Sequence, residues 1–248
     1  MEILGIDIGG SGIKGALVDV NTGEVTTERF RLATPEGASP NDVAATVAQV
    51  VENFSYHGPV GLGFPAVVIH GVCYSAANID PDWIEININS LIGKAIGMPA
   101  FAVNDADAAG VAEMRFGSGR DLKRGVVIML TLGTGIGSAV FTDGHLVPNT
   151  ELGHIEIRGK DAEKRASDAA RKRKDLSWEE WADRFQEYLE RIEALMSPDL
   201  IILGGGASKE SERFLAHLNT RAKLLPAQLL NQAGIIGAAI HANEESQL

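Results

Sequence analysis

A glycine-rich segment near the N-terminus constrains the fold more than any other part of the chain. The apolar run at residues 3–8 ends in Gly-Gly-Ser-Gly at 9–12, and a second apolar run follows at 16–20. Short apolar runs bounded by glycine are typical of strands, so the sequence predicts a β-hairpin whose tip lacks side-chain bulk. Residues 10–15 also match G-x-G-x-x-G, but dinucleotide binding needs a helix after that pattern, and here a strand follows.

The same feature returns halfway along the chain. Residues 130–136 resemble residues 6–13 once a single residue is gapped, and this alignment places Thr131 opposite Asp7. Two related lobes, each opening with a glycine hairpin, explain the echo. A chance resemblance between two glycine-rich hairpins is the alternative.

Helical patterns alternate with the predicted strands. Ser39-Pro40 is a typical helix start, and Ser177 to Glu180 form a capping box that opens a helix with one apolar face, made of Trp181, Phe185, Leu189, Ile192 and Leu195. Further helices are predicted over about 106–116, 208–218 and 233–243, and further strands at 60–64, 67–74, 101–103, 126–132, 138–142 and 200–203. This alternation indicates an α/β fold.

Composition excludes several classes of protein. With 22 Lys+Arg against 33 Asp+Glu, the net charge of −11 excludes a generally basic nucleic-acid binder. Apolar runs fall far short of the ~20 residues of a membrane span, and the first residues lack the basic start of a signal peptide. We therefore expect a cytoplasmic protein without nucleic-acid or membrane partners. The single cysteine, Cys73, excludes an internal disulfide and a multi-cysteine metal cage within one chain.

Several polar residues lie where α/β proteins bind ligands. Backbone N–H groups at a glycine hairpin tip can converge on a phosphate, and Ser11 and Lys14 add a hydroxyl and a charge; a plain tight turn is the alternative. Asn104-Asp105 follows a strand, where it either binds a ligand or caps the next helix. Together with Glu151 and His154, these side chains suit the vicinal hydroxyls of a sugar.

Five motifs, in order along the chain, resemble the ROK family of sugar kinases: residues 5–15, 104–106, 132–137, 151–154 and 233–239. Residues 151–161, 176–181 and 197–206 are similar to the polyphosphate-using glucokinases within that family. The resemblance implies a two-lobed, actin-like ATPase (ribonuclease-H-like) fold with a central cleft. It implies an N-terminal lobe at 1–104 completed by a C-terminal helix at 232–248, a C-terminal lobe at 105–231, and a homodimer.

The resemblance also assigns roles to residues of this sequence. Asp105 is the expected catalytic base, and the expected glucose ligands are Gly63, Phe64, Pro65, Asn104, Asp105, Glu151, His154 and Glu163, with Glu156 competing for the place of Glu163. Asp7 is expected to position Mg²⁺ through water. The expected donor-phosphate ligands are Asp7, Gly9, Gly10, Ser11, Gly12, Lys14, Gly133, Thr134, Gly135, Gly137, Gly204, Gly205 and Gly206. No zinc site is expected, because the cysteine cluster that follows Glu-x-Gly-His in many members is missing.

The implied reaction transfers a terminal phosphoryl group from inorganic polyphosphate, with ATP as a second donor, to the 6-hydroxyl of glucose, giving glucose 6-phosphate. Seven cations at 160–174 include the run Arg171, Lys172, Arg173 and Lys174, a predicted polyphosphate track; a solvated helix face with interleaved acids is the alternative. A strictly ATP-dependent glucokinase is a rival. A sugar-binding regulator is another, disfavoured because such members place a helix-turn-helix before the first hairpin, whose strand here starts at residue 3.

Overall fold

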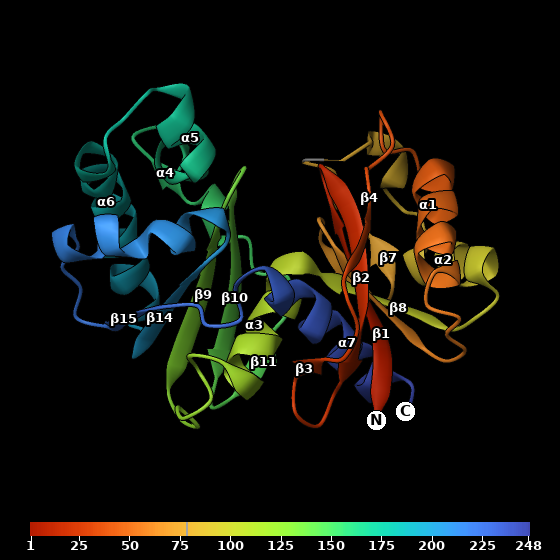
Figure 1. Cartoon of the computed structure of the whole chain (residues 1–248). Coiled ribbons are helices and arrows are strands. Elements are labelled where there is room, and N and C mark those ends of the chain that lie inside the picture. Colours follow the sequence, from red (N-terminus) through yellow and green to blue (C-terminus); the bar gives the residue numbers. More distant parts are fainter. Residues whose placement is uncertain (78) are drawn as a thin grey trace. The chain divides into compact units, whose positions relative to one another are not determined.

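The computed structural model describes residues 1–77 and 79–248 and divides the chain into two compact units (Figure 1). Unit 1 comprises residues 1–112 and 232–248, and unit 2 comprises residues 113–231. The boundary falls inside a helix, eight residues after the predicted lobe boundary at 104. The predicted lobes stay a prediction, because a compact unit need not be a domain that folds alone.

Unit 1 is built on a twisted sheet that starts with the predicted hairpin. Its strands are β1 (Glu2–Gly9), β2 (Gly12–Asp19), β3 (Glu24–Val25), β4 (Phe30–Leu32), β5 (Val60–Phe64) and β8 (Ala100–Asn104). The order is β3-β2-β1-β5-β8, with β4 also paired to β2. Strands β1 and β2 are antiparallel, whereas β5 runs parallel to both β1 and β8.

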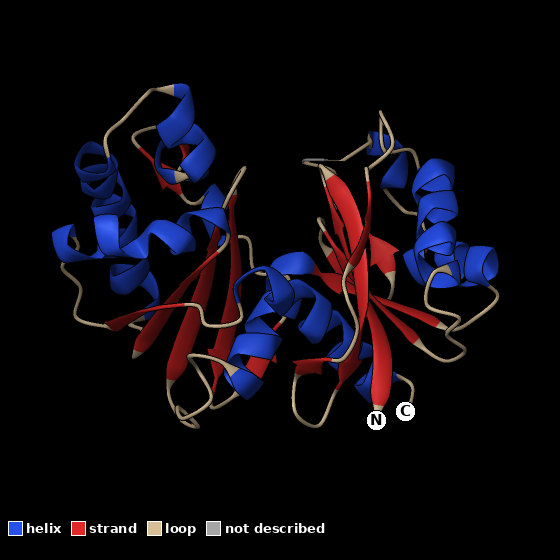
Figure 2. Ribbon diagram, in the orientation of Figure 1, coloured by secondary structure: helices blue, strands red, loops and turns tan. Residues whose placement is uncertain are grey.

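Helices cover both faces of this sheet (Figures 1 and 2). On one face, α1 (Pro40–Glu52) and α2 (Ile88–Ile96) pack on strand residues such as Leu4 and Ile6. The C-terminal helix α7 (Ala233–Glu245) lies on the other face, where a Cβ atom at Gly5 would stand 2.0 Å from the carbonyl oxygen of Ile235. Helix α3 (Asp105–Phe116) follows β8 directly. The glycine in β1 therefore lets the two ends of the chain pack together.

Unit 2 repeats the strand order of unit 1. Its sheet contains β9 (Val126–Leu132), β10 (Ile136–Thr142), β11 (His145–Val147), β14 (Leu200–Gly204) and β15 (Lys223–Pro226), in the order β11-β10-β9-β14-β15. As in unit 1, the first two long strands form an antiparallel hairpin, and the next two strands run parallel to the first. The shared topology agrees with the two related lobes expected from the sequence echo.

One long helix carries the core of unit 2. Helix α6 (Trp178–Met196) begins at the predicted capping box and packs Trp181, Phe185 and Leu189 against the sheet. Leu195 does not belong to this face, since it is 56% exposed. The other elements of unit 2 are β12 (Glu156–Ile157), β13 (Lys160–Asp161), α4 (Glu163–Ala166), α5 (Asp168–Arg173), and the 3₁₀ turns η2 (Leu152–His154), η3 (Gly206–Arg213), η4 (Leu215–His217) and η5 (Leu230–Gln232).

Two secondary-structure predictions are wrong. The helix expected over 208–218 consists of the short 3₁₀ turns η3 and η4, because this polar segment buries few side chains and Glu210 has non-helical backbone angles. The strand expected over 67–74 is instead a small hairpin of β6 (Val68–Ile69) and β7 (Val72–Cys73), reversed at His70 and Gly71, which both have positive φ. Unit 1 also contains the 3₁₀ turn η1 (Pro81–Trp83).

Among the described residues, every helix is too short or too polar to cross a membrane.

Candidate active site

The hairpin tip of unit 1 brings two predicted site residues into direct contact. Asp7 and Lys14 are register partners on β1 and β2, and their Oδ2 and Nζ atoms lie 2.8 Å apart. The side chains are only 19% and 28% exposed, respectively. Asp7, the expected Mg²⁺ residue, therefore forms an ion pair beside the tip with Lys14, an expected ligand of the donor phosphates.

A second cation at this tip was missed by sequence reasoning. Arg31, on β4, is the register partner of Lys14, and its guanidinium donates to the carbonyl oxygen of Ser11. A Cβ atom at Gly12 would lie 2.4 Å from the Arg31 Nε atom, so a larger residue there would displace the guanidinium. No motif marks Arg31, because only the pairing of β2 with β4 carries it to the tip.

The corner between β8 and α3 holds Asn104 and Asp105. Asn104 is buried, and its Oδ1 atom accepts hydrogen bonds from the backbone of Ala106 (2.9 Å) and Asp107 (3.1 Å). Its amide oxygen thus acts as the helix cap that was the alternative to ligand binding. Its Nδ2 atom donates to the carbonyl oxygen of Ala66 at 3.0 Å. Asn104 therefore ties the start of α3, where the half-buried Asp105 lies, to the segment after β5.

Gly63, Phe64 and Pro65, three of the expected glucose ligands, lie immediately before Ala66. Gly63 and Phe64 end β5, and the Phe64 ring is 1% exposed, with its centroid 4.7 Å from that of Trp83. The ring belongs to the core of unit 1. Any contact of Phe64 with a sugar would have to use its backbone atoms.

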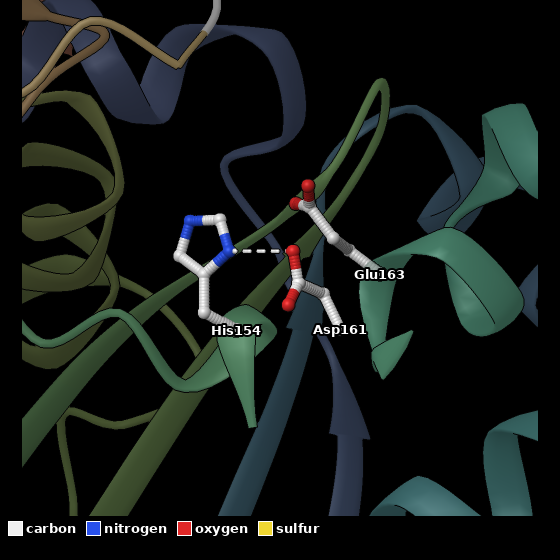
Figure 3. Close-up of side chains that lie close together, drawn as sticks. All are labelled: His154, Asp161 and Glu163. Atoms are coloured by element: carbon white, nitrogen blue, oxygen red, sulfur yellow. Dashed lines mark hydrogen bonds and ion pairs between the residues drawn. The ribbon is translucent and has the colours of Figure 1, made fainter. Parts of the chain in front are cut away.

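In unit 2 the polar residues near the second hairpin form a compact group (Figure 3). The His154 Nδ1 atom lies 3.4 Å from Asp161 Oδ2, and His154 Nε2 lies 4.0 Å from Glu151 Oε2. Burial raises the pKa of the Glu151 carboxyl; His154 opposes this rise and Glu163 adds to it. The sequence did not single out Asp161, whose carboxylate orients the imidazole of His154 from the side away from Glu151.

Glu163 joins this group and braces the second hairpin. Its Oε2 atom accepts from the backbone N–H of Ile136 at 3.2 Å, and a Cβ atom at Gly135 would lie 2.2 Å from it. Burial, with a smaller contribution from the Glu163 charge, raises the pKa of Tyr188. Glu156, the rival for the role of Glu163, is exposed and is not part of the group.

Three ligand atoms of this group could share a cation. One atom each from His154, Asp161 and Glu163 lie within 4.8 Å of one another. The ammonium of Lys164 already stands 3.0 Å from Asp161 Oδ2, so a cation partner is in place without a metal. The expectation that the protein has no zinc site stays a prediction.

The second hairpin tip has neighbours of its own in unit 2. Gly133 N donates to Gly135 O at 3.1 Å, and Gly133 O accepts from Ala169 N of α5 at 3.0 Å. With Glu163 of α4 bound to Ile136, the tip is braced from both short helices. Thr134 is exposed at its apex. The expected phosphate ligands Gly133, Thr134 and Gly135 therefore lie on a supported loop, and Gly137 lies at the start of β10.

The glycine turn after β14 borders an open pocket of about 940 Å³. Gly205 has φ +76°, and a Cβ atom there would lie 2.5 Å from Leu132 N, so this position requires glycine. Gly206 and Trp178 line the pocket, and the Arg171 guanidinium lies 4.0 Å from the Trp178 ring centroid. Three residues of this turn are predicted donor ligands. Gly204 is buried at the end of β14, whereas Gly205 and Gly206 are exposed.

Comparisons with known proteins extend these observations. Residues 3–167 match the model of the ROK family. A polyphosphate glucokinase of Mycobacterium tuberculosis strain H37Rv is 47% identical over 237 residues, which cover 95% of this chain and 89% of that protein. The crystal structure of an inorganic polyphosphate/ATP-glucomannokinase from Arthrobacter sp. strain KM has a TM-score of 0.95 and 48% identity, covering 98% of this chain and 99% of that one. A ROK family glucokinase from Streptomyces griseus, solved with glucose and AMPPNP, has a TM-score of 0.80 and 26% identity over 98% of this chain and 100% of its own.

Proposed function

Because the chain belongs to the ROK family, whose model matches two thirds of it, we propose that it phosphorylates glucose on the 6-hydroxyl, with inorganic polyphosphate as donor. The product is glucose 6-phosphate. The family and the actin-like α/β fold expected from the sequence are confirmed. The observation that carries the proposal is the 47% identity to a polyphosphate glucokinase over 95% of the chain.

Asp105 supplies the general base in this proposal. Its carboxylate accepts the proton of the glucose 6-hydroxyl as that oxygen attacks the terminal phosphorus atom of polyphosphate. The P–O bond between this phosphorus and the remaining polyphosphate, which is the leaving group, breaks in line with the attack. A base placed in this way typically contributes ~10²- to 10⁴-fold to the rate. The position at the first turn of α3 supports the role, since Asn104 fixes this turn by capping it.

We assign the remaining sugar hydroxyls to polar groups of each unit in turn, beginning with unit 1. Asn104 keeps one amide N–H beyond its bond to Ala66, and on the neighbouring strand Gly63 and Phe64 are the register partners of Val103 and Asn104. In unit 2 we assign hydroxyl binding to Glu151, His154 and Glu163, whose side chains converge (Figure 3). Asp161 is a positioning residue, because it orients His154 without belonging to the expected ligands.

Donor phosphates are bound at the two hairpin tips in this proposal. The first tip offers backbone N–H groups of residues 9–12 together with Lys14, and the second offers the braced loop at 133–137. Mg²⁺ neutralises charge on the transferring phosphoryl oxygens when it is bound. The Asp7 carboxylate fits such an ion, since it is an oxygen ligand held next to the tip by Lys14.

We propose ATP as a second donor, and a different feature of the structure supports this part of the proposal. The pocket beside Gly205 and Gly206 has the size of a small-molecule site and one aromatic wall, Trp178. Polyphosphate needs no such pocket, because it has no base or ribose. We also propose a homodimer in the cytoplasm, which the family resemblance supports.

One assay separates these functions. Glucose 6-phosphate formation is measured side by side with long-chain polyphosphate and with ATP, both with Mg²⁺. We expect turnover with both donors and a higher kcat/KM with polyphosphate. Turnover with ATP alone would replace the proposal by the strictly ATP-dependent glucokinase. Glucose binding without turnover by either donor would indicate the sugar-binding regulator.

A further inference from the structure

The run of four cations at 171–174 does not form one continuous surface. Arg171 Nε and Lys172 Nζ both pair with the carboxylate of Asp168, at 3.1 and 2.6 Å. Arg171 also stacks on the ring of Trp178. The first two cations of the run therefore share one carboxylate within unit 2, whereas no ion pair with an acid is found for the last two among the described residues.

Arg173 and Lys174 instead join cations from three other elements. The Arg173 Nη2 atom donates to the carbonyl oxygen of Lys164, which brings the end of α5 onto α4. The pKa of the Lys174 ammonium is lowered, first by Arg184 of α6 and then by desolvation; three further cations add to the shift, Arg165, Arg173 and Lys160. We call these five residues the basic cluster: Lys160, Arg165, Arg173, Lys174 and Arg184.

The neighbouring carboxylates are already engaged. Glu187 accepts from Arg165 Nη2 at 3.0 Å and is shared with Arg158 at 2.7 Å. Glu180, an acid of α6 whose pKa Arg184 helps to lower, accepts from the Ser177 backbone at 2.9 Å as part of the capping box. The charges of the basic cluster thus exceed those of the acids that pair with it.

Two donors of the basic cluster are buried without an acceptor. The Arg165 Nε and Arg184 Nη1 atoms have no hydrogen-bond partner among residues 1–77 and 79–248. Buried polar groups are nearly always hydrogen-bonded, and a charged group gains most from a partner. Converging cations that outnumber the acids paired with them are the arrangement expected where a polyanion binds.

The basic cluster is also connected to the second hairpin tip. Helix α5 begins next to that tip, because Ala169 N donates to Gly133 O, and it ends at Arg173. Lys174 lies about 8 Å further along α5 than Ala169, at 1.5 Å per residue. A phosphate chain leaving the tip along α5 (Figure 1) would therefore meet the basic cluster within a short distance.

We propose that the basic cluster binds the unreacted part of a long polyphosphate chain, away from the phosphate that is transferred. This inference rests on the proposed function and deepens it, since the cluster would make long polyphosphate a better donor than ATP. It also narrows the predicted polyphosphate track, because Arg171 and Lys172 have no part in it.

The test compares two double variants that remove the same charge. Lys174→Gln with Arg184→Gln changes the basic cluster, and Lys123→Gln with Arg124→Gln removes two exposed cations elsewhere in unit 2. We expect the first variant to raise the KM for long-chain polyphosphate at least about tenfold, with the KM for ATP and kcat changing less than about twofold. The second variant should leave all of these values unchanged.

Thermal unfolding adds a readout that does not depend on turnover. Without ligand, the cluster variant should melt no lower than the wild type, because like charges have been removed. Long-chain polyphosphate should raise the Tm of the wild type and of the control variant but not of the cluster variant. If Arg184→Gln prevents folding, the exposed pair Lys160→Gln and Lys174→Gln serves instead.

The outcomes separate the two proposals. An equal rise in KM for both donors, an unchanged KM for long polyphosphate, or an equal loss in the control variant would overturn the role of the basic cluster while the kinase function stands. If the wild type does not transfer from polyphosphate, a Tm shift present in the wild type and absent in the cluster variant supports the cluster alone. No Tm shift in the wild type would overturn it.

Discussion

The two sheets share one strand order, yet their hairpin tips are chemically different. Asp7 of β1 pairs with Lys14 across the hairpin and with Gly63 on the parallel strand β5. In unit 2, Thr131 of β9 occupies the corresponding place: it pairs with Gly137 across the hairpin and with Gly204 on the parallel strand β14. Unit 1 thus has an ion pair where unit 2 has a hydroxyl and a glycine.

The two tips also differ in what surrounds them: the second tip lacks charged residues of its own but is held by neighbouring helices. The first tip carries its own charges and gains Arg31 from β4. The second has no charged residue between 131 and 137 and is held by Glu163 and by Ala169 of the adjacent helices. One topology therefore serves two purposes. In unit 1 it presents charged side chains at the hairpin tip, and in unit 2 it presents a backbone loop that Glu163 and Ala169 support.

The largest expected effect tests whether unit 1 supplies the general base of the reaction. Asp105→Asn should lower kcat with polyphosphate by ~10²- to 10⁴-fold, because the amide cannot accept the proton of the sugar hydroxyl. The Tm should stay close to that of the wild type. Asp121→Asn removes an exposed carboxylate of unit 2 and is the matched control. Nearly full activity in Asp105→Asn would remove this residue from the role of base.

A second pair of variants compares the corresponding places in the two hairpins directly. Asp7→Asn should lower kcat by about 10²-fold and raise the Mg²⁺ concentration needed for half-maximal rate, because an oxygen charge beside the transferring group is lost. Thr131→Val, at the matching position, should change kcat less than about threefold. Steady-state rates over a Mg²⁺ titration measure both. Equal losses in the two variants would mean that the hairpins do not differ in the way described.

The carboxylate that braces the second tip should act mainly on glucose. Glu163→Gln should raise the KM for glucose about tenfold and change kcat less, because a hydroxyl ligand loses its charge. Glu156→Gln removes the rival carboxylate, which is exposed outside the polar group, and should leave the KM unchanged. The reverse pattern in glucose saturation curves would assign the sugar contact to Glu156.

Two serine caps extend the comparison to stability. Ser177 forms a reciprocal capping box in unit 2, accepting from Glu180 N at 3.1 Å and donating its backbone N–H to Glu180 Oε2. Ser39 in unit 1 accepts from Asp42 N at the longer distance of 3.4 Å, so this hydrogen bond is weaker. Ser177→Ala should cost about 1 kcal/mol in free energy of unfolding and Ser39→Ala about half as much. Urea unfolding of both variants measures the two values, and a larger cost for Ser39→Ala would contradict this ranking.

The smallest expected effect is a pH dependence in unit 2. Burial raises the pKa of Glu151 above its ordinary value of 4.5, so its contribution to stability is full below that value and is lost as pH rises through the raised pKa. Glu151→Gln cannot ionise and escapes this loss. Relative to the wild type, it should therefore gain stability as the pH rises above 4.5, as measured by a series of urea midpoints over this range. A relative loss over this range would show that the ionised carboxylate is stabilising.

Local signals were sufficient for much of this molecule. Short apolar runs bounded by glycines predicted both hairpins, and cap residues predicted the starts of α1 and α6. Hairpins and helix starts can be predicted in this way because they depend on residues that are close in sequence. The pairing of Asp7 with Lys14 was also within reach, since a two-residue loop between Gly9 and Gly12 places these two residues opposite each other.

Other features depend on contacts that sequence order does not reveal. Arg31 reaches the first tip only through the pairing of β2 with β4, and Asp161 reaches His154 only through a short hairpin of two-residue strands. The segment at 208–218 contains residues compatible with a helix, but too few of them are buried to stabilise one. Such tertiary contacts decide which polar residues of a pattern converge on a site.

A crystal structure with glucose bound tests the central claim most directly. The 6-hydroxyl oxygen should lie about 2.6–3.2 Å from a carboxylate oxygen of Asp105, the range in which a general base can take its proton. A hexose bound with its 6-hydroxyl far from Asp105 would contradict the assignment of the base, and with it the division of labour between the two hairpin units.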